Sequence, residues 1–272
     1  MERPYRAITE EEISTYREDG IVFLKGFFST EWIEKLREET EVDLASPGPL
    51  HQELTPKGNQ GRFFFDTFLW TFNDGFKDFV MNSPAAEIAG SMMESNKINV
   101  FFDQLLVKEP GTSDKTPWHH DITYWPVEGE QICTLWLALD HVDAANGAVE
   151  YVKGSHKWGK NYNPPAFAGD DRYKLALPPV PDIDALRAQL SIAQFEFEPG
   201  DCTVHHGKMV HGAPGNARAG TRRRAYVTRW AGDSVTYAPH PKKQRMMWDP
   251  NIAVGGPLDS DIRPVVWQRY VR

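Results

Sequence analysis

The chain has 272 residues, a formal net charge of -8 at pH 7, 40% hydrophobic residues and 25% charged residues. These fractions are typical of a globular protein, and the length is compatible with a single large all-β domain. The negative net charge argues against a nucleic-acid partner and against an anionic membrane surface, because both would require a basic face.

No apolar run approaches the ~20 residues that a membrane-spanning helix needs. The N-terminal sequence MERPYRAITEEE is charged and lacks the apolar segment of a signal peptide. We therefore expect a cytoplasmic protein. The two cysteines, Cys133 and Cys202, are expected to be free buried thiols in a reducing compartment. The sequence carries no signal for an oligomeric state.

The N-terminal part, residues 8–96, is expected to form helices around a strand. Thr9 followed by Glu12 is the pattern of a capping box, which opens a helix that Gly20 ends. Apolar spacing and capping residues predict a strand and then two further helices, one capped by Ser29 or Thr30 and the next by Ser83, in the segments GIVFLKGFF, STEWIEKLREETEVDL and SPAAEIAGSMMES.

From residue 97 to residue 232 the pattern changes to short strand-like runs separated by Gly, Pro, Asn and Asp. No helical pattern alternates with them, so we expect antiparallel strands that close into a barrel or a two-sheet jelly roll. A proline-rich stretch at about residues 157–194 is long enough to be a lid inserted into this core. With a tail over residues 233–272, the prediction is one domain over residues 1–272, mainly β with flanking helices.

The stretch TPWHHDITYW contains a candidate metal site. Residues two apart on a strand share a face, so His119 and Asp121 can lie side by side while His120 points away. A second histidine from a distant strand would complete a set of two imidazoles and one carboxylate, which suits non-haem Fe(II) and leaves open positions. An isolated His-x-Asp is more often an ordinary histidine that is hydrogen-bonded to its neighbour.

The candidate third ligand lies in GDCTVHHGKMVHGAPGN, where three histidines compete. Gly207 interrupts strand alternation, so alternation alone does not select among His205, His206 and His211. The context favours His211, because arginines follow it after eleven to thirteen residues. Buried arginine is well suited to a bidentate contact with a carboxylate.

Four segments in order, WHHDITYW, LWLALDHVDAANGAVEYVKGSH, GDCTVHHGKMVHGAPGN and RRRAYV, resemble the phytanoyl-CoA dioxygenase family of Fe(II)- and 2-oxoglutarate-dependent oxygenases. The resemblance covers roughly residues 8–232. It implies a double-stranded β-helix, which is a jelly-roll or cupin-like core, and iron held by His119, Asp121 and His211. The activity that it implies is hydroxylation, or another oxidation, of an unactivated C–H with O2 as oxidant and with release of succinate and CO2.

The resemblance also implies an arginine that binds the distal carboxylate of 2-oxoglutarate. Family spacing from the second histidine selects Arg222, whereas the motif Arg-x-Ala selects Arg223. Strand alternation favours Arg223, which shares a face with Ala225 and Val227. Further co-substrate contacts carried over from the family, each of which could equally be barrel packing, are Gln104, Thr134 and Trp136.

The substrate is expected to be a small or medium organic molecule, because no long basic groove for coenzyme A phosphates is evident. The aromatic residues Trp118, Tyr124 and Trp125 are substrate-facing candidates, although aromatics in such positions more often pack in a core. In halogenating relatives the carboxylate ligand is replaced by a small residue, so Asp121 favours hydroxylation, desaturation or cyclisation. Two other functions stay open: a cupin-like metal enzyme of another reaction type, and a non-catalytic jelly-roll binding protein.

Overall fold

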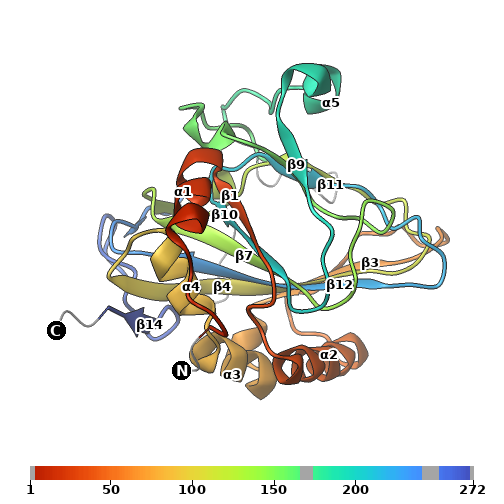
Figure 1. Cartoon of the computed structure of the whole chain (residues 1–272), viewed down its shortest axis with the longest axis horizontal. Coiled ribbons are helices and arrows are strands. Elements are labelled where there is room, and N and C mark those ends of the chain that lie inside the picture. Colours follow the sequence, from red (N-terminus) through yellow and green to blue (C-terminus); the bar gives the residue numbers. More distant parts are fainter. Residues whose placement is uncertain (1–3, 166–173, 241–250, 270–272) are drawn as a thin grey trace.

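The computed structural model describes residues 4–165, 174–240 and 251–269. Two antiparallel sheets form its centre, with helices α2 and α3 on the outer side of the larger sheet and β9 and β11 of the smaller sheet on the other side (Figure 1). The larger sheet has the order β1-β10-β7-β12-β4-β3-β2 with β14 added to β4, and the smaller sheet has the order β5-β11-β8-β9. This is the jelly-roll, cupin-like arrangement that the sequence predicted.

The helices and strands occupy bounds close to those expected from the sequence. The helices are α1 (Glu10–Asp19), α2 (Thr30–Ala45), α3 (Asp74–Asn82), α4 (Ala85–Met92) and α5 (Ile183–Leu186), with 3-10 turns at η1 (Leu69–Thr71), η2 (Asp121–Tyr124), η3 (Ser155–Lys157) and η4 (Arg187–Gln189). The strands are β1 (Ile21–Leu24), β2 (Gln52–Glu53), β3 (Phe63–Thr67), β4 (Lys97–Lys108), β5 (Thr116–His119), β6 (Val127–Glu128), β7 (Ile132–Ala138), β8 (Glu150–Val152), β9 (Ile192–Gln194), β10 (Cys202–His206), β11 (His211–Ala213), β12 (Arg223–Ala231), β13 (Thr236–Tyr237) and β14 (Val265–Gln268).

Capping residues determine where α1 and α2 begin and where α1 ends. The Thr9 side chain accepts a hydrogen bond from the Glu12 amide at 3.2 Å, and Gly20 ends α1 with φ +75°. Ser29, rather than Thr30, caps α2 by accepting from the amide of Trp32. The capping-box prediction is confirmed because both of its partners are within hydrogen-bonding reach along the chain.

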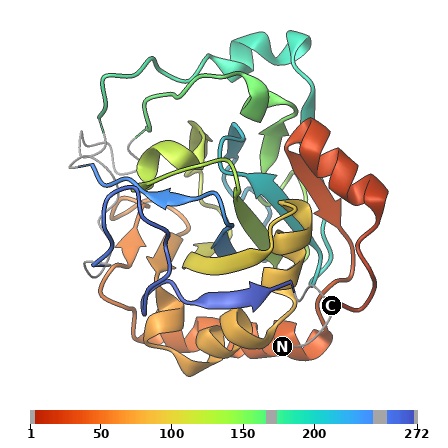
Figure 2. The same ribbon diagram turned by 90° about the vertical axis from the view of Figure 1, so that its left-hand side faces the viewer.

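Several elements were not predicted from the sequence, among them α3 and β14. Helix α3 begins after Asn73, whose side chain accepts from the amides of Gly75 and Phe76. The C-terminal strand β14 pairs antiparallel with the first residues of β4, beside which it lies in Figure 2. The tail therefore adds a strand to the large sheet, which only the tertiary arrangement reveals.

The two faces of the large sheet have different surroundings. On the outer face, Leu135, Leu137 and Tyr226 pack in one cluster with apolar residues of α1 to α4. On the inner face, Trp136 and Val227 pack in another cluster with residues of the smaller sheet. Side chains alternate between faces along each strand, so polar residues in register with the inner cluster must project into the barrel.

The structure can be compared with three further expectations, which concern the cysteines, membrane-spanning helices and the lid. Cys133 and Cys202 are both buried and free, as expected. Within the described ranges, none of the helices combines the length and apolarity that crossing a bilayer would take. The expected lid over about residues 157–194 contains η3, α5, η4 and β9, and residues 166–173 of it lie outside the described part of the chain.

A buried carboxyl pair sits where α2 meets β3. Asp66 accepts hydrogen bonds from the amides of Gly48 at 2.6 Å and Thr67 at 2.7 Å, which favour its ionised form. Asp43 is 3% exposed, and burial together with the charge of Asp66 raises the pKa of Asp43 to about 7. Asp43 therefore keeps a proton in the folded protein over a pH range in which the unfolded chain has lost it.

We expect the protein to lose stability as the pH rises from about 4 to about 7, because over this range Asp43 is already ionised in the unfolded chain but still protonated in the folded protein. Asp43→Asn should be more stable than the wild type by roughly 2 kcal/mol at pH 8.5, and the difference should shrink towards pH 5. Urea unfolding at several pH values measures this. Glu38→Gln, at an exposed position of the same helix, is the control, and parallel pH profiles for wild type and Asp43→Asn would contradict the assignment.

Candidate metal and co-substrate site

Backbone pairing in the smaller sheet brings two distant segments together. His211 of β11 is the direct cross-strand partner of His119 in β5 on one side and of Tyr151 in β8 on the other. Directly opposed residues on antiparallel strands project from the same face. The two imidazole rings consequently lie with their centroids 4.2 Å apart.

Asp121 reaches the same point from a turn rather than from a strand. Strand β5 ends at His119, His120 is extended with φ -125° and ψ 150°, and Asp121 begins the 3-10 turn η2. The prediction of a continuous strand through Asp121 was therefore wrong, because the chain turns where the amide of Ile122 donates to the carbonyl of Gly207 at 2.9 Å. His120 still points away and accepts a hydrogen bond from the amide of Tyr162.

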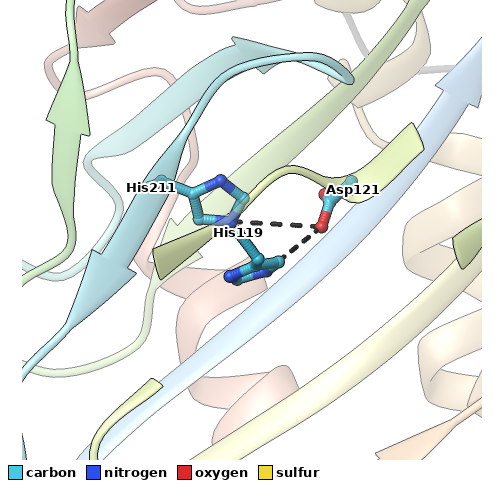
Figure 3. A group of neighbouring side chains, drawn as sticks. All are labelled: His119, Asp121 and His211. Atoms are coloured by element: carbon cyan, nitrogen blue, oxygen red, sulfur yellow. Dashed lines mark ion pairs between the residues drawn. The ribbon is translucent and has the colours of Figure 1, made fainter. Parts of the chain in front are cut away.

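His119, Asp121 and His211 converge, as Figure 3 shows. One Asp121 carboxylate oxygen lies 3.4 Å from Nε2 of His119 and 4.0 Å from Nε2 of His211. One potential ligand atom from each of the three buried residues lies within 4.8 Å of the others. Two imidazoles and a carboxylate in this arrangement are a ligand set suited to a divalent transition metal.

Backbone carbonyls set the tautomer of both imidazoles. Nδ1 of His119 lies 2.8 Å from the carbonyl oxygen of Pro117, and Nδ1 of His211 lies 2.9 Å from that of Met209. A carbonyl only accepts, so each Nδ1 carries the hydrogen and each Nε2 directs its lone pair towards Asp121. Burial, with the neighbouring His119, lowers the pKa of His211 to about 4 and keeps it neutral, as a metal ligand must be.

Asp121 is ionised in the folded protein. Burial alone would raise its pKa, but the neighbouring His119, His211 and Arg229 hold that pKa well below the usual value. The Thr134 hydroxyl donates to the second carboxylate oxygen of Asp121 at 2.9 Å. This bond fixes the carboxylate so that its other oxygen faces the two imidazoles.

A buried guanidinium lies further along the inner face of the large sheet. Arg223, 1% exposed, begins β12, and its guanidinium carbon is 5.6 Å from the centre of the Trp136 ring. Its Nη2 donates to the carbonyl of Gly147 at 3.1 Å, whereas Nε and Nη1 have no hydrogen-bonding partner among the described residues. Such unsatisfied donors are costly unless a ligand accepts from them.

The neighbouring arginines face outwards. Arg222 forms ion pairs with Glu109 and Glu41, each at 2.6 Å. Arg224 pairs with Asp140 at 2.7 Å. Of the two competing anchor positions, the structure thus brings Arg223 into the barrel and leaves Arg222 on its outside.

The other candidate co-substrate contacts also lie on the inner face. Gln104, Thr134 and Trp136 are all in register with Val227 or Arg229 of β12. Arg229 itself was missed by the sequence analysis, although extending the alternation of Arg223 by six residues along the same strand would have found it. Its Nη2 donates to Oε1 of Gln104 at 2.7 Å.

The histidines that competed with His211 take other positions. His205 is 2% exposed and lies on the inner face, with Nε2 3.9 Å from the second oxygen of Asp121. It is not part of the three-residue cluster. His206 lies on the adjacent strand position and accepts from the amide of Lys208 at 3.0 Å.

The aromatic candidates are separated by the fold. Tyr124 has its ring 5.9 Å from that of His119, and its hydroxyl donates to the carbonyl of Pro165. Trp125 packs against two phenylalanine rings of β4. Trp118 contacts the segment around α5, donating to Asp184 at 3.4 Å. Tyr124 is thus the candidate whose ring packs edge-on against a member of the metal-ligand cluster.

Comparison with known proteins gives consistent results. The family model of phytanoyl-CoA dioxygenase (PhyH) matches residues 16–225. The dioxygenase cdmD of Talaromyces verruculosus is 28% identical over 239 residues, which are 78% of this chain and 70% of that protein. This dioxygenase is a relative of the chain, and similarity to it does not assign its substrate to this protein.

Two solved structures share the fold. The non-heme alpha ketoglutarate dependent carbocyclase SnoK from nogalamycin biosynthesis aligns with a TM-score of 0.78 at 21% identity, covering 98% of this chain and 99% of that chain. The epimerase SnoN, in complex with Fe3+, alpha ketoglutarate and nogalamycin RO, aligns with a TM-score of 0.73 at 20% identity, covering 94% and 98%. The family match extends over most of the chain, and the fold agrees with it. This protein belongs to the phytanoyl-CoA dioxygenase family.

Proposed function

We propose that His119, Asp121 and His211 hold Fe(II), that Arg223 binds the distal carboxylate of 2-oxoglutarate, and that the protein oxidises a C–H bond of a small or medium organic substrate. Membership of the family makes the chain an Fe(II)- and 2-oxoglutarate-dependent dioxygenase. The observation that carries the residue assignment is the cluster of three donor atoms within 4.8 Å, in a barrel that also buries an arginine.

The donor set fits ferrous iron. Two neutral imidazoles and one carboxylate would hold a ferrous ion and leave coordination positions open for 2-oxoglutarate and O2. The carbonyls of Pro117 and Met209 orient the two imidazoles, and Thr134 orients the carboxylate. Such outer contacts hold ligands ready for the metal.

Arg223 fits a carboxylate of 2-oxoglutarate. Its Nε and Nη1 are unsatisfied, and one of them together with the remaining Nη2 hydrogen can form the fork that a carboxylate accepts. Burial lowers its pKa to about 10, so it remains charged at neutral pH. Trp136 and Val227 cover the space beside it with apolar surface, which strengthens the ion pair by excluding water.

With Fe(II), 2-oxoglutarate and O2 bound, the centre supplies an oxidant for an unactivated C–H, with release of succinate and CO2. The residues of the chain position these groups and keep water away. The ring of Tyr124 lies beside His119, and its hydroxyl donates to the carbonyl of Pro165 within the expected lid. Tyr124 therefore connects the lid to the residues that would hold the metal. Asp121 occupies the position that a halide would need, which favours hydroxylation, desaturation or cyclisation.

Anaerobic addition of Fe(II) and 2-oxoglutarate should produce a weak visible charge-transfer band. His211→Ala should abolish the band because it removes one of the three ligands, and metal affinity should fall by about 100-fold. His206→Ala, which removes a neighbouring imidazole outside the cluster, is the matched control and should keep the band. A non-catalytic binding protein would stay colourless, and a band that survives in His211→Ala would refute the ligand assignment.

Arg223→Met should weaken 2-oxoglutarate binding by roughly 10- to 100-fold, since a charge-assisted pair in a buried site contributes ~1.5–3 kcal/mol. Arg222→Met removes the same charge from the outside of the barrel and should change the affinity by less than about threefold. Titration of the charge-transfer band with 2-oxoglutarate measures both. A larger loss in Arg222→Met than in Arg223→Met would reverse the choice of anchor.

A further inference from the structure

A second arginine is buried inside the barrel, and the proposed function does not use it. Arg229 is 7% exposed and lies on β12 six residues beyond Arg223, so the two side chains project from the same face. Its guanidinium carbon lies 4.5 Å from the centre of the Phe102 ring. Its Nη2 donates to Gln104 at 2.7 Å.

The rest of this guanidinium is unsatisfied. Nε and Nη1 of Arg229 are buried and have no hydrogen-bonding partner in the described ranges. The pairing residue Gln104 is neutral, so it orients the group without neutralising its charge. Burying a charged group with unsatisfied donors lowers the stability of the folded protein. At functional sites a bound ligand commonly offsets this loss by accepting hydrogen bonds from those donors.

Register places Arg229 beside the metal ligands. Arg229 is the direct cross-strand partner of Thr134, whose hydroxyl donates to Asp121. Arg223 and Arg229 are separated by roughly 20 Å along the strand, at ~3.4 Å per residue. One distal carboxylate of 2-oxoglutarate can therefore serve only one of them.

The charges of the loaded centre do not balance without a further anion. Fe(II), Arg223 and Arg229 bring four positive charges, whereas Asp121 and 2-oxoglutarate bring three negative ones. Asp103 is the other carboxyl that acts on Arg229, but burial raises its pKa to about 7 even though Tyr226 and the amide of Trp70 donate to it and favour its charged form. Its strand position alternates with that of Gln104, on the outer face of the sheet.

We propose that Arg229, oriented by Gln104, binds an anionic group of the primary substrate, and that this substrate is a carboxylic acid. The proposal rests on the function proposed above. Nε or Nη1 together with the remaining Nη2 hydrogen can form the fork that a carboxylate accepts, and Phe102 offers apolar surface to the carbon skeleton next to it. The carboxylate would hold the substrate beside Asp121.

The test uses the protein loaded anaerobically with Fe(II) and saturating 2-oxoglutarate. Three acids and their isosteric amides serve as probes: phenylacetate and phenylacetamide, cinnamate and cinnamamide, hexanoate and hexanamide. Each is titrated while the charge-transfer band and the midpoint of thermal unfolding are recorded. We expect at least one acid to bind about tenfold or more tightly than its amide, and Arg229→Met to abolish that preference.

Arg222→Met, which removes a charge from the outside of the barrel, should keep the preference for the acid. Should Arg229→Met fail to fold, Arg229→Lys and Gln104→Leu replace it, and each should lower the preference at least threefold. Equal binding of acids and amides, or a preference that survives substitution at position 229, would overturn the proposal. A tenfold or greater loss of 2-oxoglutarate affinity in Arg229→Met would also overturn it, because the guanidinium would then serve the co-substrate.

Failure of this proposal is distinguishable from failure of the proposed function. Formation of the charge-transfer band before any acid is added tests the metal and co-substrate assignment. The difference between acid and amide is measured afterwards, on the same loaded protein. A normal band with no acid preference rejects the role of Arg229 alone.

Discussion

The site depends on the register between β5 and β11. Because His119 and His211 are direct cross-strand partners, their rings meet on one face of the smaller sheet. A slip of one residue would turn one imidazole to the opposite face, since side chains alternate along a strand. The pairing of β11 with β8 on its other edge helps to hold this register, with Tyr151 opposite His211.

The outer face of the large sheet contributes to stability, whereas the inner face carries the polar residues of the candidate site. The outer face packs against α1 to α4 in an extensive apolar cluster, whereas a smaller apolar cluster on the inner face leaves room for polar residues. The inner face can then carry groups that are costly to bury, such as Arg223, Arg229 and His205. Such groups reduce stability in the absence of ligands, which is a common feature of functional sites.

One strand, β12, organises the interior. Its outer side chains, such as Tyr226, belong to the helix-packed core, while Arg223 and Arg229 mark two positions along the inner face. The proposed metal ligands lie near the Arg229 end, because Thr134 links that position to Asp121. Under the proposed function, the order along the strand separates the arginine that binds the co-substrate from the arginine that binds the substrate.

Features carried by short-range interactions were determined by the sequence alone. The capping box of Thr9 and Glu12, the stop at Gly20 and the strands around the two histidine segments involve residues close together in the chain. The resemblance of ordered motifs was likewise sufficient for the family and for the jelly roll. Helix α3 was missed because Asn73, its cap, stands in an aromatic stretch with mixed periodicity.

Only the tertiary structure decided which polar residues share an interior. Strand alternation could not select among His205, His206 and His211, because Gly207 interrupts it, and only the sequence context favoured His211. Pairing of β11 with β5 makes that choice. The register of the large sheet likewise brings Arg229 next to Thr134 and turns Arg222 towards Glu109. Contacts between distant segments follow from strand pairing across the whole domain, which no local pattern of residues encodes.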